Sequence, residues 1–278
     1  MATSYRLFAA PRLWYWVAYC QPQWIGFMRE EKVNFTNSRG DTLSGVLHFP
    51  DENSPRGAVI LCHGMESDKE SEKLVFLSRE LAGRNIISLR FDFAYVGESS
   101  GKFEDITYSG EAEDLRAAYV LVRSRCAGKI ALLGSSMGGT VALMFAAEER
   151  DVAALVTVSS PLYPGRFPRR ILDAAQLRDW RERGFTFYNG NRLNVSLLED
   201  LDRIDVPACA RRVSCPVLIL HGDSDVVVPV QEAYELHEYL ATSKRLSILK
   251  GSDHRFSNPE MMKRAVAEAL EWLTEHVS

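Results

Sequence analysis

The chain alternates short apolar runs with longer segments that are apolar on one side only. The short runs are typical of strands covered on both faces and lie at residues 58–62, 86–91, 130–133, 152–158, 217–220 and 246–249. Between most of them, apolar residues recur at helical spacing, as in residues 74–81, 111–122 and 140–148. This alternation predicts an α/β fold with a mostly parallel central sheet and helices on both faces.

Other signals mark where elements begin and end. Residues 32–36 and 43–49 predict an antiparallel hairpin, because the turn formers of residues 37–41 separate them. Ser67 and Glu70 have the spacing of a capping box before a helix that Gly83 ends. Asn258 and Pro259 are expected to open the last helix.

One long segment interrupts the alternation. Residues 161–213 contain several prolines and show no strand pattern, and a connection of this length inside a compact domain is usually functional or disordered. Its aromatic content favours order, so we interpret it as a small helical cap inserted into a core domain of residues 32–160 and 214–278. Four aromatic residues either line the substrate pocket or form the core of the cap itself: Trp180, Phe185, Phe187 and Tyr188.

Composition places the chain among ordinary globular proteins. Its 278 residues are 46% hydrophobic and 25% charged, which suits one large domain with an insertion. The net charge of -4 provides no basic field for a nucleic-acid backbone, so we expect no nucleic-acid partner. Arg166, Arg169 and Arg170 could meet an acidic substrate, but we favour a solvated charged face.

The cysteines indicate free thiols. They are widely spaced and lack the two-residue spacing of zinc or redox motifs: Cys20, Cys62, Cys126, Cys209 and Cys215. A reducing, cytoplasmic compartment fits them best. No group of His, Cys, Asp and Glu has metal-ligand spacing, so we expect no metal.

An aromatic segment of residues 1–31 precedes the core domain. Its apolar run of residues 13–20 is far shorter than a membrane span and lacks a signal-peptide cleavage site. Trp14, Trp16 and Trp24, with arginines around them, could seat residues 1–28 at a membrane interface. We favour a segment that packs on the domain surface or against a second copy in a homodimer.

A candidate nucleophile lies directly after the strand of residues 130–133. Residues 134–138 match the pattern Gly-x-Ser-x-Gly before a helix, which places the Ser136 hydroxyl at a sharp strand-to-helix turn. The following helix points its positive end at the place where negative charge develops. A phosphate-binding turn is disfavoured, because neither a Walker lysine nor a Gly-x-Gly-x-x-Gly pattern is present.

A serine needs a base, and four histidines follow Ser136: His221, His237, His254 and His276. His237 and His276 lie in helix patterns, and His221 would precede the acid, whereas the fold requires the order serine, acid, histidine. His254 follows the last strand, at the edge where catalytic loops gather. We therefore predict His254 as the base.

The acid is expected in the loop that follows the strand of residues 217–220. Asp225 is preferred over Asp223, which is better suited to bonding the N–H groups of the loop, and over Asp253, because a neighbour of His254 usually points away. The oxyanion would be held by the backbone N–H groups of Met137 and Met65. His63 is interpreted as structural.

Together these motifs resemble the α/β-hydrolase superfamily, over nearly all of the chain from about residue 32 onward. The stretch Gly101-Lys102-Phe103-Glu104-Asp105 is similar to one in the bacterial cinnamoyl and feruloyl esterase branch. The resemblance implies the triad Ser136, Asp225 and His254, oxyanion donors at Met65 and Met137, and short acyl or hydroxycinnamoyl esters as substrates. Ser135 stands where these enzymes often have histidine, and Met65 where many have an aromatic residue, so the pocket wall differs.

The sequence therefore predicts a serine carboxylesterase that works through an acyl-enzyme without a cofactor. Within the same fold, the alternatives are a thioesterase, a monoacylglycerol-type lipase or a serine peptidase. An inactive, hydrolase-like binding protein is the alternative from another class.

Overall fold

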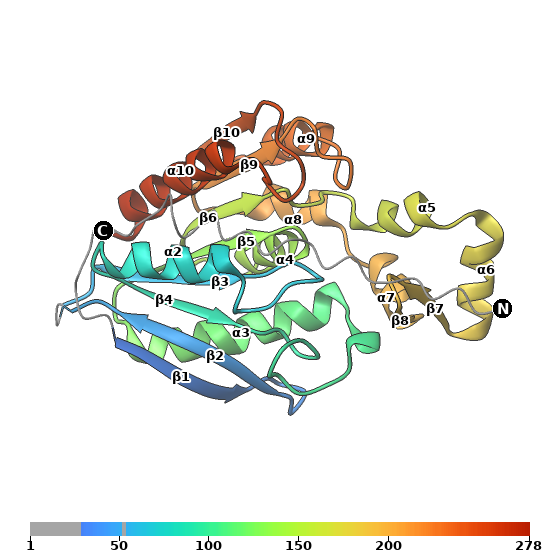
Figure 1. The fold of residues 1–278 in the computed structure, drawn as a ribbon, viewed down its shortest axis with the longest axis horizontal. Coiled ribbons are helices and arrows are strands. Elements are labelled where there is room, and N and C mark those ends of the chain that lie inside the picture. Colours follow the sequence, from blue (N-terminus) through green and yellow to red (C-terminus); the bar gives the residue numbers. More distant parts are fainter. Residues whose placement is uncertain (1–28, 52–53) are drawn as a thin grey trace.

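A computed structural model describes residues 29–51 and 54–278, so the predictions for residues 1–28 lie outside the described part. An eight-stranded sheet forms its centre (Figure 1). In spatial order its strands are β1 (Arg29–Thr36), β2 (Thr42–Phe49), β4 (Ile86–Phe91), β3 (Gly57–Cys62), β5 (Lys129–Ser135), β6 (Val152–Val158), β9 (Val217–Gly222) and β10 (Lys244–Leu249). β1 and β2 form the predicted antiparallel hairpin, β2 runs antiparallel to β4, and the other pairs are parallel. The predicted α/β fold is confirmed.

Helices cover both faces of the sheet. One face carries α2 (Glu72–Ala82) and α10 (Pro259–Val277), and the other carries α3 (Tyr108–Arg125), α4 (Met137–Ala146), α8 (Val206–Arg212) and α9 (Gln231–Tyr239). Side chains alternate along a strand, so Leu132 packs under the α3 and α4 face while Leu133 packs under α2 and α10. This two-sided burial explains why the strands are continuously apolar.

The predicted capping box at Ser67 and Glu70 is wrong. α2 begins at Glu72 with Ser71 at its N-cap position, and Glu70 instead lies 2.8 Å from the guanidinium of Arg90. Arg90 is buried, so its charge attracts a carboxylate that the local pattern assigned to the helix. The predicted end of α2 at Gly83 and the Asn258 cap of α10 are confirmed.

The segment of residues 161–213 contains the expected helices α5 (Phe167–Ile171), α6 (Ala174–Arg183) and α7 (Ser196–Leu201). It also contains an antiparallel pair, β7 (Phe185–Tyr188) and β8 (Asn191–Asn194), so the expectation of no strands here is wrong. Asn189 and Gly190 form the two-residue turn with φ of 49° and 81°, the left-handed values that tight hairpins favour. α5, α6 and this hairpin project beyond the sheet (Figure 1).

Candidate active site

Ser136 occupies a strained turn between β5 and α4. Its φ of 52° is rare for a residue with a side chain, and strain of this kind costs about 1–3 kcal/mol unless the surroundings hold it. Its N–H donates to the Val158 carbonyl oxygen over 2.8 Å. A Cβ at Gly134 would collide with the Gly138 carbonyl, and one at Gly138 would collide with the His63 carbonyl. The glycines of the motif are therefore needed for close backbone packing.

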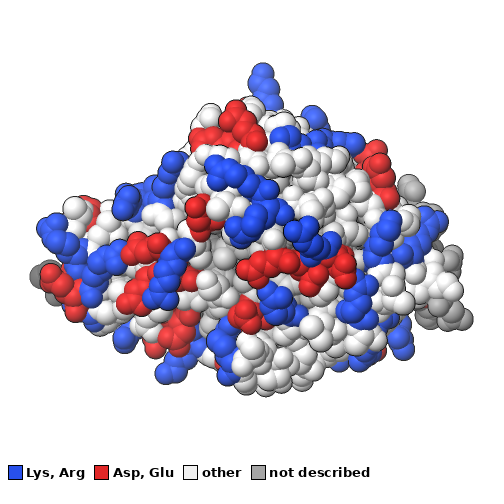
Figure 2. Space-filling model, turned by 180° about the vertical axis from the view of Figure 1, so that it is seen from behind, with Lys and Arg blue, Asp and Glu red and all other residues white. Residues whose placement is uncertain are grey.

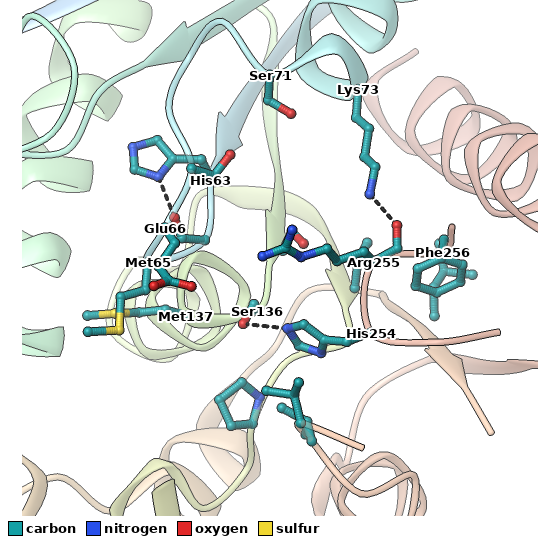
Figure 3. A pocket seen from close by; sticks show the side chains of 18 of the residues that line it. His63, Met65, Glu66, Ser71, Lys73, Ser136, Met137, His254, Arg255 and Phe256 are labelled. Carbon is teal, nitrogen blue, oxygen red and sulfur yellow. Dashed lines mark hydrogen bonds between the residues drawn. The ribbon is translucent and has the colours of Figure 1, made fainter. Parts of the chain in front are cut away.

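The structure brings the three predicted triad residues together from three separate loops. The His254 Nε2 atom lies 3.1 Å from Ser136 Oγ (Figure 3). The His254 Nδ1 atom lies 2.8 Å from Asp225 Oδ2. With a proton on Nδ1, the imidazole donates to Asp225 and presents a lone pair to the serine hydroxyl. This arrangement can remove the proton from Ser136 as its oxygen attacks an electrophile.

Asp225 is held as a carboxylate by several donors. Its Oδ1 atom accepts the N–H groups of Val227 and Val228, each over 2.8 Å. Burial opposes ionisation, but hydrogen bonds from His221, His254 and the Val228 N–H outweigh it and hold the pKa of Asp225 well below its usual range. The carboxylate therefore stays charged at neutral pH.

His221 is a partner of Asp225 that the sequence reasoning missed. Its Nε2 atom lies 2.9 Å from the Val228 carbonyl oxygen and 3.3 Å from Asp225 Oδ2, so a proton there is shared between two acceptors. The sequence contains a signal for this contact, because His221, near the end of β9, precedes Asp225 of the following loop by four residues. His221 therefore orients the acid, and its hydrogen bonds go to Val228 and Asp225 and not to Ser136.

The other two candidate acids stabilise loops instead. Asp223 accepts the Gly251 N–H over 2.6 Å, and Asp253 accepts the Ser257 N–H over 2.8 Å. Neither carboxylate is hydrogen-bonded to His254. The preference for Asp225 therefore agrees with the geometry.

The two predicted oxyanion donors flank Ser136. Met137 is the first residue of α4, so its N–H has no acceptor within the helix, and Met65 lies in the loop after β3. Within residues 29–51 and 54–278, neither amide donates to a protein acceptor. A Cβ at Gly64 would lie 3.3 Å from the Ser136 Cβ, which shows how closely that loop approaches the serine. Both amides are therefore placed to serve a developing negative charge.

His63 has the structural contacts that the sequence suggested. Its Nδ1 atom lies 2.8 Å from the Gly64 carbonyl oxygen, and its Nε2 atom accepts the Phe93 N–H over 3.1 Å. Burial lowers the pKa of His63, so the ring is neutral and fixes the loop that carries Met65.

Comparison with known proteins agrees with this geometry. A family model described as an alpha/beta hydrolase domain matches residues 55–211, which is more than half of the chain. The chain belongs to the α/β-hydrolase family. One relative is the polyketide transferase grgF of Penicillium sp, which is 26% identical over 80% of this chain and 88% of the relative. Another is the mitochondrial palmitoyl-protein thioesterase ABHD10 of Bos taurus, which is 24% identical over 84% of this chain and 78% of the relative. Est1E of Butyrivibrio proteoclasticus, solved with ferulic acid, has a TM-score of 0.76 at 22% identity and covers 87% of this chain and 98% of its own.

The serine of this α/β hydrolase opens into a cavity of about 680 Å³. Of the four cap aromatics considered for its wall, Tyr188 lines it. Trp180 is fully buried in the core, and Phe185 and Phe187 pack edge-to-face on each other, with Phe187 63% exposed. These three do not line the cavity, because side chains alternate along β7 and Trp180 lies on the inner side of α6. Cavity residues that sequence reasoning did not single out include Tyr108, Tyr163, Phe167, Leu197 and Val226.

Arg166, Arg169 and Arg170 are exposed, as expected for a solvated charged face, but two of them also make specific contacts. Arg170 donates to the Val227 carbonyl oxygen over 2.8 Å and to Glu232 Oε1 over 2.5 Å. Arg166 lies 3.7 Å over the ring of Tyr163. In this α/β hydrolase, Arg170 therefore ties the cap to the loop that carries Asp225.

The rest of the described surface of this α/β hydrolase carries both signs of charge. Lysine and arginine side chains are interspersed with acidic ones on the face shown in Figure 2. In the part of the chain that the structure describes, no cluster of His, Cys, Asp and Glu could hold a metal, and Cys62, Cys126, Cys209 and Cys215 are free. No helix within the same residues is long and apolar enough to cross a bilayer.

Proposed function

We propose that this α/β hydrolase is a serine carboxylesterase that forms an acyl-enzyme on Ser136. The observation that carries the proposal is the continuous hydrogen-bonded line from Ser136 Oγ through His254 to Asp225, with distances of 3.1 Å and 2.8 Å. Two backbone amides beside the serine support it, because an ester carbonyl gains full negative charge on its oxygen during attack.

In the first half-reaction, Ser136 Oγ attacks the ester carbonyl carbon and its proton moves to His254 Nε2. The N–H groups of Met65 and Met137 hold the oxyanion. The tetrahedral intermediate then collapses, the carbon–oxygen bond to the alcohol breaks, and the alcohol leaves with the proton from His254. Asp225 stays ionised and stabilises the imidazolium that forms between these two transfers.

In the second half-reaction, a water molecule attacks the acyl carbon and passes one proton to His254. The bond between Ser136 Oγ and the acyl carbon breaks, Ser136 regains that proton, and the carboxylic acid is released. No other co-reactant is needed. A thioester would follow the same steps, and the thioesterase and transferase named among the relatives make this the second candidate.

The preference for short-chain or hydroxycinnamoyl esters stays a prediction. The ferulic acid bound to Est1E supports an aromatic acyl group, and that protein shares the fold of this chain. A panel of acetate, butyrate and hydroxycinnamate esters, matched thioesters and amides distinguishes the alternatives.

Labelling with a fluorophosphonate tests the nucleophile. The wild-type protein should be labelled, and Ser136→Ala should lose both labelling and esterase activity, with a fall in kcat of about 10⁶-fold. Ser135→Ala is the matched control, because it changes the neighbouring hydroxyl and should still be labelled. Absence of labelling in the wild type would favour the inactive binding protein instead.

A further inference from the structure

The cavity at Ser136 continues beyond the cap into the layer between α2 and α10. Six side chains that line it belong to these two helices: Leu74 and Leu77 from α2, and Met262, Ala265, Val266 and Ala269 from α10. All six are shielded from the outer surface. We call this part of the cavity the α2/α10 arm. It lies on the sheet face opposite to α3 and α4, so it is separate from the part under the cap.

The arm is joined to the nucleophile through the end of β5. Leu133 faces the α2 and α10 layer, and Ser135, two residues later, continues on that same face beside Ser136. Leu133, Ser135 and Ser136 all line the cavity. The small side chain of Ser135 leaves an open connection at this junction.

The walls of the arm are apolar. Phe256 adds an aromatic side chain that is 2% exposed and is held at a φ of 52°, a strained value for a residue of this size. Three charged residues, Lys73, Asp253 and Arg255, line the cavity beside these apolar walls. The Lys73 ammonium donates to the Arg255 carbonyl oxygen (Figure 3). That bond joins α2 to the loop after β10. Water would find few hydrogen-bond partners along such walls, whereas methylene groups lose contact with water on entering them.

The arm is also elongated. Met262, Ala265, Val266 and Ala269 occupy successive turns on one side of α10, and a helix rises 1.5 Å per residue, so these positions extend about 10 Å along its axis. An acetyl or butyryl group would leave most of that length empty. The two alanines, one turn apart, provide the space between the helices that larger side chains would fill.

We infer that the α2/α10 arm binds an unbranched alkyl chain of the ester substrate, supplied by a fatty acyl group or by a fatty alcohol. The inference rests on the proposed esterase function only in that Ser136 attacks the bond to which this chain is attached. On this inference the substrates are aliphatic esters of at least medium chain length, rather than the short-chain or hydroxycinnamoyl esters predicted from the sequence.

Filling the arm tests the inference. Ala269→Phe should lower kcat/KM for p-nitrophenyl decanoate, or for decyl butyrate, by about tenfold or more, because lost apolar contacts reduce specificity by such factors. The loss should be larger for these long-chain esters than for p-nitrophenyl butyrate, and a circular dichroism spectrum like that of the wild type shows that the variant is folded. Ala267→Phe is the matched control, because Ala267 lies on the exposed side of the same helix. The decanoate and decyl series together report which half of the ester enters the arm.

A second measurement does not depend on catalysis. Sodium decanoate, titrated by calorimetry, should bind to the wild type and to Ala267→Phe, and should lose binding in Ala269→Phe. Equal binding by all three proteins, or an Ala269→Phe variant with unaltered decanoate and decyl ester kinetics, overturns the inference. Hydrolysis of butyrate through Ser136 would then leave the proposed function intact. A wild type that binds decanoate in the arm but hydrolyses no ester would refute the esterase proposal and support the arm.

Discussion

Asp223 and Asp225 stand two positions apart in the loop after β9 and have different partners. Asp223 bonds the backbone of the loop after β10, whereas Asp225 bonds His254, His221 and two amides of its own loop. Asp225 therefore differs from Asp223 in its contacts, although both are aspartates. These contacts also fix the carboxylate before any substrate arrives.

Replacement of the acid separates the two aspartates experimentally. Asp225→Asn should reduce kcat by about 10⁴-fold, because an amide in this place favours the wrong histidine tautomer while its oxygen still accepts the Val227 and Val228 amides. Ester hydrolysis under saturating substrate measures the change. Asp223→Asn is the control and should stay within a few-fold of the wild type, as about one loop hydrogen bond is altered. Equal losses in both variants would argue against Asp225 as the orienting acid.

The sequence predicted individual site residues where their roles depend on neighbouring positions in the chain. The glycines around Ser136 and the positions of Asp225 and His254 after strands predict the proposed triad, and the structure places these three side chains within hydrogen-bonding distance. Trp180 could not be assigned in the same way. Whether it lines a pocket depends on which side of α6 meets the core, and that is decided by tertiary packing.

Among the elements, α5 and α9 are joined by a buried carboxylate. Glu232 of α9 is 1% exposed, and it accepts the N–H groups of Leu162 and Tyr163 over 2.9 Å and 3.0 Å as well as the guanidinium of Arg170. Leu162 and Tyr163 lie where the chain enters the cap. In the turn between β7 and β8, Asn189 donates to the carboxylate of Glu66 over 2.8 Å. Glu66 directly follows Met65 in the loop after β3. The cap is therefore attached both to the acid loop and to the oxyanion loop.

Removal of the buried carboxylate should weaken this attachment. Glu232→Ala leaves two buried amides and the Arg170 charge without their acceptor, and we expect a loss of about 3 kcal/mol in the free energy of unfolding. Urea denaturation measures it. Glu238→Ala, at an exposed position of α9, should change the value by less than about 0.5 kcal/mol. A similar small change for Glu232→Ala would show that the cap is held mainly by its apolar contacts.

Elements with a strong period were predicted well, and so was the β1–β2 hairpin, but the hairpin inside the cap was not. The sheet strands and α10 follow from apolar patterning and from the Asn258 cap. The pair β7 and β8 was missed because its aromatic residues suggested a helical cap, although Asn189-Gly190 is a hairpin signal. The α2/α10 arm has no sequence signature, since an alanine in a helix gives no indication of whether a neighbour fills the space beside it.

At the scale of the whole molecule, the buried carboxyl group of Glu111 affects how stability depends on pH. Both carboxyl oxygens of Glu111 are buried, and within the described residues they have no hydrogen-bond partner. Burial, together with the nearby charge of Asp114, raises the pKa of Glu111 well above its usual value, while Arg39 acts in the opposite direction. The folded protein therefore retains a proton there that the unfolded chain releases above about pH 4.3.

Because the folded state keeps this proton and the unfolded state loses it, the contribution of Glu111 to the free energy of unfolding falls as pH rises. Because the folded pKa is raised, the contribution of Glu111 is complete below the unfolded pKa and is lost as pH increases towards the folded pKa. Glu111→Gln imitates the protonated form and should gain over the wild type by up to about 1.4 kcal/mol per pH unit in this range. Unfolding free energies of both proteins, measured from about pH 5 to about pH 8, provide the comparison. Glu113→Gln, at a partly exposed position of the same helix, is the control, and its difference in unfolding free energy from the wild type should not change with pH. A difference between Glu111→Gln and the wild type that is equally constant would contradict the prediction.

The order of the triad along the chain has a consequence for biosynthesis. Ser136 is carried by β5 in the middle of the sheet, but Asp225 and His254 follow β9 and β10, which close one edge and are translated much later. A nascent polypeptide that has left the ribosome only as far as residue 220 holds the hydroxyl without its base. If Ser136 is the nucleophile that we propose, such intermediates lack the group that activates it, and the reactive serine forms only after the final strand has docked.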